Sequence, residues 1–162
     1  MTDNHIGKTL WMATALPASN DTTGFEALTW VQVKGIQTLP VFGVTHSNTD
    51  VPDLATGFTS GTKGAGSGRE SQFTTREISG DTGQGNVKTQ ANDKDGLVSL
   101  KIAEGSGTDS GDGPALVTGD AVKYAQGYLH SHEENQGTDN THKGATCSFK
   151  QNNFTVEGTE PA

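Results

Sequence analysis

Alternating apolar and polar residues mark several short stretches of this chain, with the two-residue period of a β-strand that buries one face. In Leu97–Ala103 every second residue from Val98 is apolar, and Ser99 and Lys101 stand between them. We therefore expect these two polar side chains to point away from the core. Other stretches, rich in β-branched and aromatic residues and bounded by Gly, Pro, Asn or Asp, predict the remaining strands: Lys8–Ala15, Gly24–Val33, Leu39–Thr45, Glu70–Ile78, Val122–His132 and Ala145–Val156.

The last predicted strand changes phase along its length. Cys147 and Phe149 alternate with polar neighbours, whereas Phe154 and Val156 fall on the opposite phase. A bulge or turn near Gln151–Asn153 would let both pairs face inward. The stretches LTWVQV and LPVFGV have apolar residues on both phases, which predicts a cover on both faces, the second of them another subunit.

One segment has the signals of a helix, from Asp81 to about Lys94. An aspartate can cap its first turn, and the Asp95-Gly96 pair is a stop signal. Two internal glycines weaken the helix, and it has almost no apolar side. We expect it to be short and superficial.

The pattern is that of a single domain covering residues 1–162, mostly β, with a long loop at about 46–68. This loop is polar and rich in glycine, and loops of this length are usually functional or disordered. We expect it to become ordered only on contact with a neighbouring copy. The stretch Glu104–Pro114 predicts a second flexible connection.

Composition adds that the core is small for a chain of this size. Only 30% of the residues are hydrophobic, and the mean hydropathy is −0.56. Disulfides, metals or oligomerisation commonly support such thin cores. Cys147 is the only cysteine, so no disulfide can form within one chain, and we expect a buried thiol in a reducing compartment. The apolar run Leu10–Ala18 is too short for a membrane span and is interpreted as part of the first strand.

The charge disfavours a nucleic-acid-binding protein. Nineteen acidic and eleven basic residues give a net charge of −8, which repels a phosphate backbone. The basic residues are scattered singly. Such a chain is better suited to letting DNA pass than to holding it.

Motifs for nucleotide and calcium binding fail on inspection. Lys63 follows a threonine rather than a glycine, and Arg69 stands where a dinucleotide-binding loop needs its third glycine. Asp93 and Asp95 imitate part of a calcium loop, but Ile102 occupies the position of its bidentate glutamate. We expect neither a cofactor nor an enzyme activity.

Histidines form the best metal candidate. His130 and His132 are two residues apart on a predicted strand and so are expected on one face, with Glu133 adjacent and His142 beyond a turn. The spacing matches no recognised metal motif, and solvated or interface histidines are the commoner outcome.

The chain as a whole resembles the major tail tube proteins of long-tailed, siphovirus-type bacteriophages. The resemblance rests on the order of four stretches: GKTLWMATALPASNDTTGFEALTWVQVKGI, FGVTHSNTDVPDL, DTGQGNVKTQANDKDGLVSLKIAEG and the closing YAQGYLHSHEENQGTDNTHKGATCSFKQNNFTVEGTE. The matching positions are Gly24, Phe25, Trp30, Gly127, Ser131, Gly137 and Gly158. The sequence is short for the family, and we expect no appended immunoglobulin-like domain.

The resemblance implies a β-sandwich or open barrel with one short flanking helix, related to type VI secretion tubes. It also implies rings of six copies with a continuous inner sheet, stacked through the long loop and the termini into a conduit for DNA ejection. Its partners would be other copies of itself, the tape measure, tail terminator and baseplate proteins, and DNA that passes without specific binding. The chain would reside in the virion tail and, before assembly, in the host cytoplasm.

Two groups of residues are candidates for this function. The ring-stacking loop contributes His46, Asp50, Asp53, Phe58, Lys63 and Arg69. An acidic lumen would keep DNA sliding by repulsion, and its candidate carboxylates are Glu26, Glu70, Glu77, Glu104, Glu133, Glu134 and Asp139.

Three other functions stay open at this point. A head decoration or tail terminator subunit would share the composition without forming long tubes. A carbohydrate-binding β-sandwich would need exposed aromatic residues, whereas Trp11 and Trp30 fall in predicted strands. An enzyme would use the face of His130 and His132.

Overall fold

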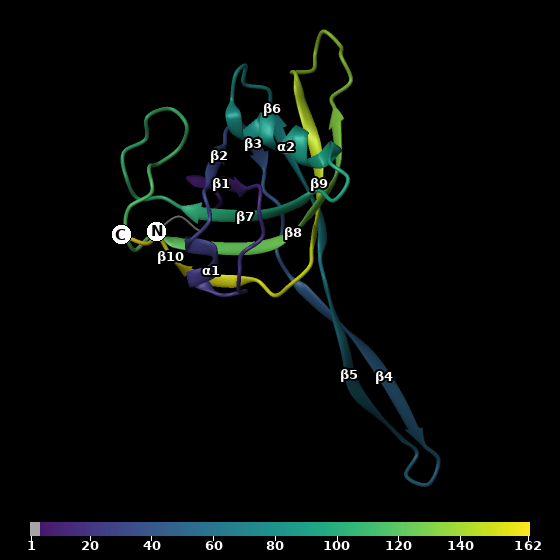
Figure 1. Cartoon of the computed structure of the whole chain (residues 1–162). Coiled ribbons are helices and arrows are strands. Elements are labelled where there is room, and N and C mark those ends of the chain that lie inside the picture. Colours follow the sequence, from purple (N-terminus) through teal and green to yellow (C-terminus); the bar gives the residue numbers. More distant parts are fainter. Residues whose placement is uncertain (1–3) are drawn as a thin grey trace.

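The computed structural model describes residues 4–162, and within them the chain forms ten strands and two helices (Figure 1). Eight strands make one antiparallel sheet in the order β2-β1-β7-β8-β9-β6-β3, with β10 also paired to β8, and β4 and β5 form a separate pair. The bounds are β1 Lys8–Ala13, α1 Thr22–Glu26, β2 Val31–Val33, β3 Ile36–Thr38, β4 Val44–Asp53, β5 Phe58–Gly68, β6 Glu70–Arg76, α2 Thr82–Asn92, β7 Leu97–Glu104, β8 Ala121–Glu134, β9 Gly144–Gln151 and β10 Val156–Thr159. This confirms a mostly β, antiparallel fold.

The long strand β8 joins two halves of the sheet that run crosswise to each other (Figure 1). Its residues 122–128 pair with β7, and its residues 127–134 pair with β9. Gly127 lies where the two pairings overlap, and a Cβ there would collide with the backbone carbonyl of Lys150. Only glycine permits this close approach of β8 to β9.

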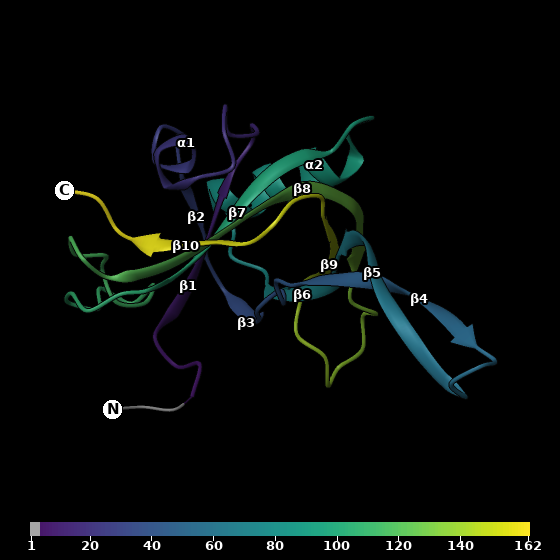
Figure 2. The same ribbon diagram turned by 90° about the horizontal axis from the view of Figure 1, so that it is seen from below.

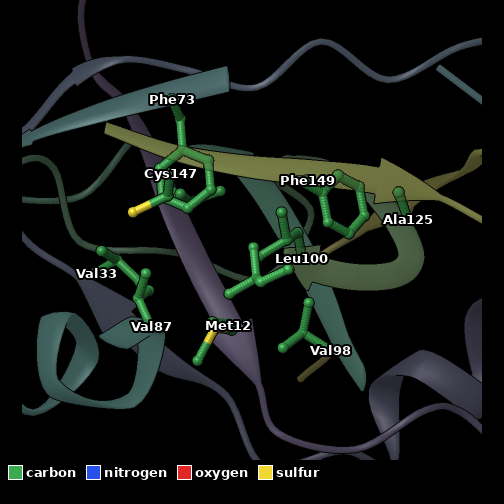
Figure 3. Packing of buried hydrophobic residues seen from close by; sticks show 11 residues of the cluster. Met12, Val33, Phe73, Val87, Val98, Leu100, Ala125, Cys147 and Phe149 are labelled. Atoms are coloured by element: carbon green, nitrogen blue, oxygen red, sulfur yellow. The ribbon is translucent and has the colours of Figure 1, made fainter. Parts of the chain in front are cut away.

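The main core fills the space between the two halves and α2 (Figure 3). Leu10 and Leu100 come from one half, Phe73 and Phe149 from the other, and all four are 0% exposed. Val87 of α2 closes the cluster. A chain with few apolar residues thus builds its core by folding a single sheet over itself, so that the apolar residues of one half pack against those of the other.

Helix α2 forms where the sequence predicts it. The carboxylate of Asp81 accepts a hydrogen bond from the backbone N–H of Gln84 at 3.0 Å, which caps the first turn. Gly83 lowers the helix propensity, but a Cβ at this position would collide with the backbone carbonyl of Gln32 in β2. This glycine therefore lets α2 pack closely on β2.

The other face of β1, β7 and β8 is covered too, which corrects the expectation that Lys101 faces solvent. Lys101 is 2% exposed, and its ammonium lies 5.0 Å and 5.4 Å from the ring centroids of Trp11 and Trp30. It pairs with Glu160 at 3.1 Å. Phe25 of α1 stacks on Tyr124 with centroids 4.9 Å apart. Helix α1 and the C-terminal segment that follows β10 thus form a second layer over this face, and Ser99, expected at the surface, is fully buried.

Three predictions of local structure are wrong. The stretch Gly24–Val33 begins as helix α1, because the Asp21 carboxylate caps it by accepting from the N–H of Gly24 at 2.8 Å. Residues 39–43 lie outside any strand; Pro40 lacks the N–H that a strand ladder uses. Phe154 is 56% exposed rather than buried, although the chain does break near Gln151–Asn153 as expected.

Candidate assembly surfaces

The segment expected as a loop at 46–68 is instead most of a long β-hairpin, which we call the arm. Its strands β4 and β5 pair from Val44 opposite Gly68 to Asp53 opposite Phe58, with an irregularity after His46. Every residue from 47 to 63 is exposed. The arm extends away from the rest of the chain, which we call the body (Figures 1 and 2).

The apolar periodicity that identifies a strand is missing from the arm because both of its faces are exposed. A weaker signal is present in the β-branched residues Thr45, Thr49, Thr59 and Thr62, which suit an extended backbone. The turn is signalled by Gly57, whose φ is +66° and whose N–H donates to the carbonyl of Asp53 at 2.9 Å.

Strand β9 holds the base of the arm. The side-chain oxygen of Gln151, a residue only 1% exposed, accepts from the N–H of Gly43 at 2.9 Å. The ammonium of Lys150 donates to the carbonyl of Gly68. The His46 ring stacks on Phe154 with centroids 6.0 Å apart, which gives this exposed phenylalanine a contact. These interactions fix the direction in which the arm leaves the body.

The predicted stacking residues spread along the whole arm rather than gathering in one place. His46 lies at the base, Lys63 lies opposite Asn48 in the hairpin register, and Arg69 follows β5. Asp50, Asp53 and Phe58 lie toward the tip. Hydrogen bonds from the backbone N–H of Ala55 and from Thr56 hold the pKa of Asp53 below its usual value.

Sequence reasoning missed two apolar residues of the tip. Val51 is 53% exposed and Leu54 is 100% exposed, beside Phe58 at 73%. Val51 and Phe58 share one face with Asp53, because Asp53 is opposite Phe58 and Val51 is two residues away. The signal available in the sequence was an apolar cluster around a turn, where polar residues are the rule.

A second candidate surface is the face of β6, β9 and the C-terminal half of β8 that lies opposite the main core, which we call the polar sheet face. Ser131, Ser148 and Gln72 share this face in register. The Ser131 hydroxyl donates to Ser148 at 2.8 Å, and the Gln72 amide donates to Ser148 at 3.4 Å. Thr74 and Thr146 adjoin them. The centre of this face is therefore polar and hydrogen-bonded.

The seven candidate lumen carboxylates are all exposed, but they do not share a surface. Register places Glu70 and Glu133 on the polar sheet face, with Glu134 on the opposite face, where it pairs with Lys88 of α2 at 3.7 Å. The others lie on α1, after β6, at the end of β7 and between β8 and β9: Glu26, Glu77, Glu104 and Asp139.

The histidines expected on one face lie on opposite faces. A register shift between Leu129 and Ser131 changes the alternation, so His130 lies by Glu70 at 3.0 Å, whereas His132 is opposite Cys147 on the core side. Within residues 4–162 no three His, Cys, Asp or Glu side chains form a group that could hold a metal ion.

Two further groups bear on the alternative functions. Burial raises the pKa of the Cys147 thiol to about 12, so the thiolate that a cysteine nucleophile needs does not form near neutral pH. Trp11 and Trp30 are half-buried and pack against Lys101, so they form no exposed platform for a sugar ring. In the described chain no helix has the length and apolar character needed to cross a membrane.

Comparison with known proteins gives a likeness in fold rather than in sequence. No family and no curated protein matches the sequence. Among solved structures, the chain is similar to the tail tube of phage SPP1, determined by solid-state NMR and cryo-electron microscopy, with a TM-score of 0.59 and 12% sequence identity. The match covers 96% of this chain and 78% of that chain. This chain therefore has a tail-tube-like fold.

Proposed function

We propose that this chain is a structural, non-enzymatic subunit of a phage tail tube. The observation that carries the proposal is the likeness in fold to the SPP1 tail tube over 96% of the chain. The arm supports it, because residues 47–63 of the hairpin are all exposed and extend away from the described part of the body. A two-stranded hairpin alone is marginally stable in water, so contacts with other copies would stabilise the arm.

In this proposal six copies form a ring, and rings stack through the arm and the termini into a conduit for DNA ejection. The resulting tube belongs to the virion tail, and its subunits are made in the host cytoplasm. The tape measure protein would occupy the tube before DNA does, and the tail terminator and baseplate proteins would bind its ends.

The polar sheet face is the surface best suited to line the lumen. Its serine and glutamine side chains already bond to one another, so fewer of their donors are free to contact phosphates. Its charges are mixed, since Glu70 and Glu133 share the face with Lys150 and Arg76. The acidic lumen therefore stays a prediction that depends on which further carboxylates neighbouring copies bring to the bore.

Electron microscopy of the purified chain tests the proposal. We expect rings or tubes with a central channel, and a sedimentation profile that shifts to larger species as concentration rises. A well-folded monomer at every concentration would contradict it. A reconstruction of the tube would also decide the lumen, because a majority of Lys and Arg on the inner surface would contradict an acidic bore.

A further inference from the structure

The tip of the arm combines exposed apolar side chains with negative charge. Val51, Phe58 and Asp53 share one face of the hairpin, and Leu54 lies in the turn, fully exposed. Asp50 adds a second carboxylate, and no Lys or Arg occurs between His46 and Lys63. Exposed apolar clusters rimmed by charge are typical of protein contact sites.

The body carries a groove with the complementary character. It has a volume of about 660 Å³ and lies between the segment that follows β3 and the ends of β1, β7 and β8. Its apolar lining is formed by Ile36, Leu39, Val41, Phe42 and Ile102. All but Val41 also pack against the main core, so the floor of the groove is held in place before any ligand arrives. Val41 is 50% exposed at its edge.

Positive charge lines one side of this groove. Lys8 and Lys123 flank Ile102, which register places on the same face of the sheet. Lys123 pairs with Glu157 at 3.3 Å, and Glu157 also lines the groove, so Lys8 supplies the unbalanced positive charge. Within residues 4–162 no carboxylate lies at ion-pairing distance from the ammonium of Lys8, whose hydrogen-bond partner is the His5 ring at 3.3 Å. An acidic partner would therefore find an available cation beside an apolar surface.

The chain cannot fill this groove with its own arm. Val41 and Phe42 line the groove only two or three residues before β4 begins at Val44. The tip lies at the other end of a ten-residue strand, roughly 30 Å away at 3.3 Å per residue. The arm also points away from the body (Figures 1 and 2).

We propose that the groove accepts the arm tip of a second copy of this chain, with Phe58, Leu54 and Val51 on its apolar floor and Asp53 beside Lys8. This contact rests on the proposed function and supplies the acceptor that ring stacking requires. Donor and acceptor are different surfaces of each copy, so the contact is heterologous. It leaves a free tip at one end and a free groove at the other, and such contacts propagate as open stacks.

Charge reversal tests the pairing of Asp53 with Lys8. Asp53→Lys and Lys8→Glu, each alone, are expected to raise the concentration needed for assembly about tenfold, since each puts like charges together. The double variant Asp53→Lys/Lys8→Glu is expected to recover most of the loss. Sedimentation velocity measures assembly, and circular dichroism establishes that each variant is folded. Two single losses without recovery in the double variant would contradict the pairing.

Cross-linking tests the contact itself. One preparation carries Leu54→Cys and another Val41→Cys, and the mixture is treated with a short reagent that joins two thiols. Cys147 is buried with its pKa raised to about 12, so it competes little for the reagent. We expect dimers in the mixture and far fewer in either preparation alone. The matched control replaces Val41→Cys with Val117→Cys, at a position that is 47% exposed and outside the groove.

The outcomes separate this inference from the proposed function. Tubes that form without a cross-link between the two positions, and that tolerate Phe58→Ser and Val41→Ser, would overturn the docking site and leave the tail tube function standing. A chain that forms neither tubes nor cross-links would overturn both. We expect tubes that show the cross-link. Tube formation should be lost in Phe58→Ser and kept in Val117→Ser.

Discussion

The body and the arm are both antiparallel β-structure, but they are stabilised in different ways. In the body, Phe73 and Phe149 are removed from water between two half-sheets and a helix. In the arm, every residue from 47 to 63 is exposed, so the backbone ladder and the contacts at the base hold it. The body therefore supplies the folding stability of the chain, whereas we expect the arm to depend on contacts with other copies.

Replacing a phenylalanine by alanine should lower the free energy of unfolding far more in the body than in the arm. Phe149→Ala empties a fully buried position of the main core and should lower the free energy of unfolding by about 4 kcal/mol. The matched variant Phe58→Ala, at the exposed tip, should change it by less than about 0.5 kcal/mol. Urea denaturation measures both. Equal effects would mean that the arm contributes to the folded core.

A somewhat smaller effect is expected in the second layer of the body. Glu160→Ala leaves the ammonium of Lys101 buried between two tryptophans without its carboxylate, which should cost about 3 kcal/mol. The double variant Lys101→Met/Glu160→Ala removes the buried charge as well and should recover much of the loss. Thermal denaturation would show this, and no recovery would mean that the ion pair itself is the main stabilising contact.

At the junction of the two regions we expect an intermediate effect. Gln151→Ala leaves the N–H of Gly43 without its acceptor and removes bonds to Asn153 and Thr155, a loss of about 2 kcal/mol. Hydrogen exchange should quicken most at the base of the arm. Gln72→Ala, at an exposed position of β6, serves as the control. If it speeds hydrogen exchange at the base of the arm as much as Gln151→Ala does, Gln151 is not the anchor of the arm.

The smallest effect on folding should come from removing the arm. Replacing residues 47–65 by an Asn-Gly turn joins the two strands beyond the pairs at the base. The free energy of unfolding should change by less than about 0.5 kcal/mol, while assembly into tubes is lost. Removing only 56–66, most of one strand, would leave β4 unpaired, so the symmetric deletion is the sharper test. Tubes from the shortened chain would contradict a stacking role for the arm.

Elements whose signals are local could be located from the sequence alone. Alternation at Val98 and Leu100 located β7, and the cap at Asp81 and the stop at Gly96 located α2. The order of stretches along the chain was enough to expect the tail-tube-like fold that the comparison bears out. These features were readable because a cap, a turn or a buried strand face leaves its mark within a few neighbouring residues.

Features that depend on which segments pack against a residue could be seen only in the folded chain. The alternation predicted a surface position for Lys101. In the fold, Trp11, Trp30 and Glu160 cover its side chain, so it is buried on the second face of the sheet. The register shift that sends His130 and His132 to opposite faces arises in the pairing of β8 with β9. The arm was not predicted as a hairpin because hydrophobic periodicity reflects burial of one strand face within the chain. The arm buries neither face, so its sequence has no such periodicity. The groove lined by Lys8 is built from segments that are far apart in the sequence, so it could be recognised only in the folded chain. The fold places this groove near the base of the arm, and the proposed ligand, the arm tip, lies at the other end.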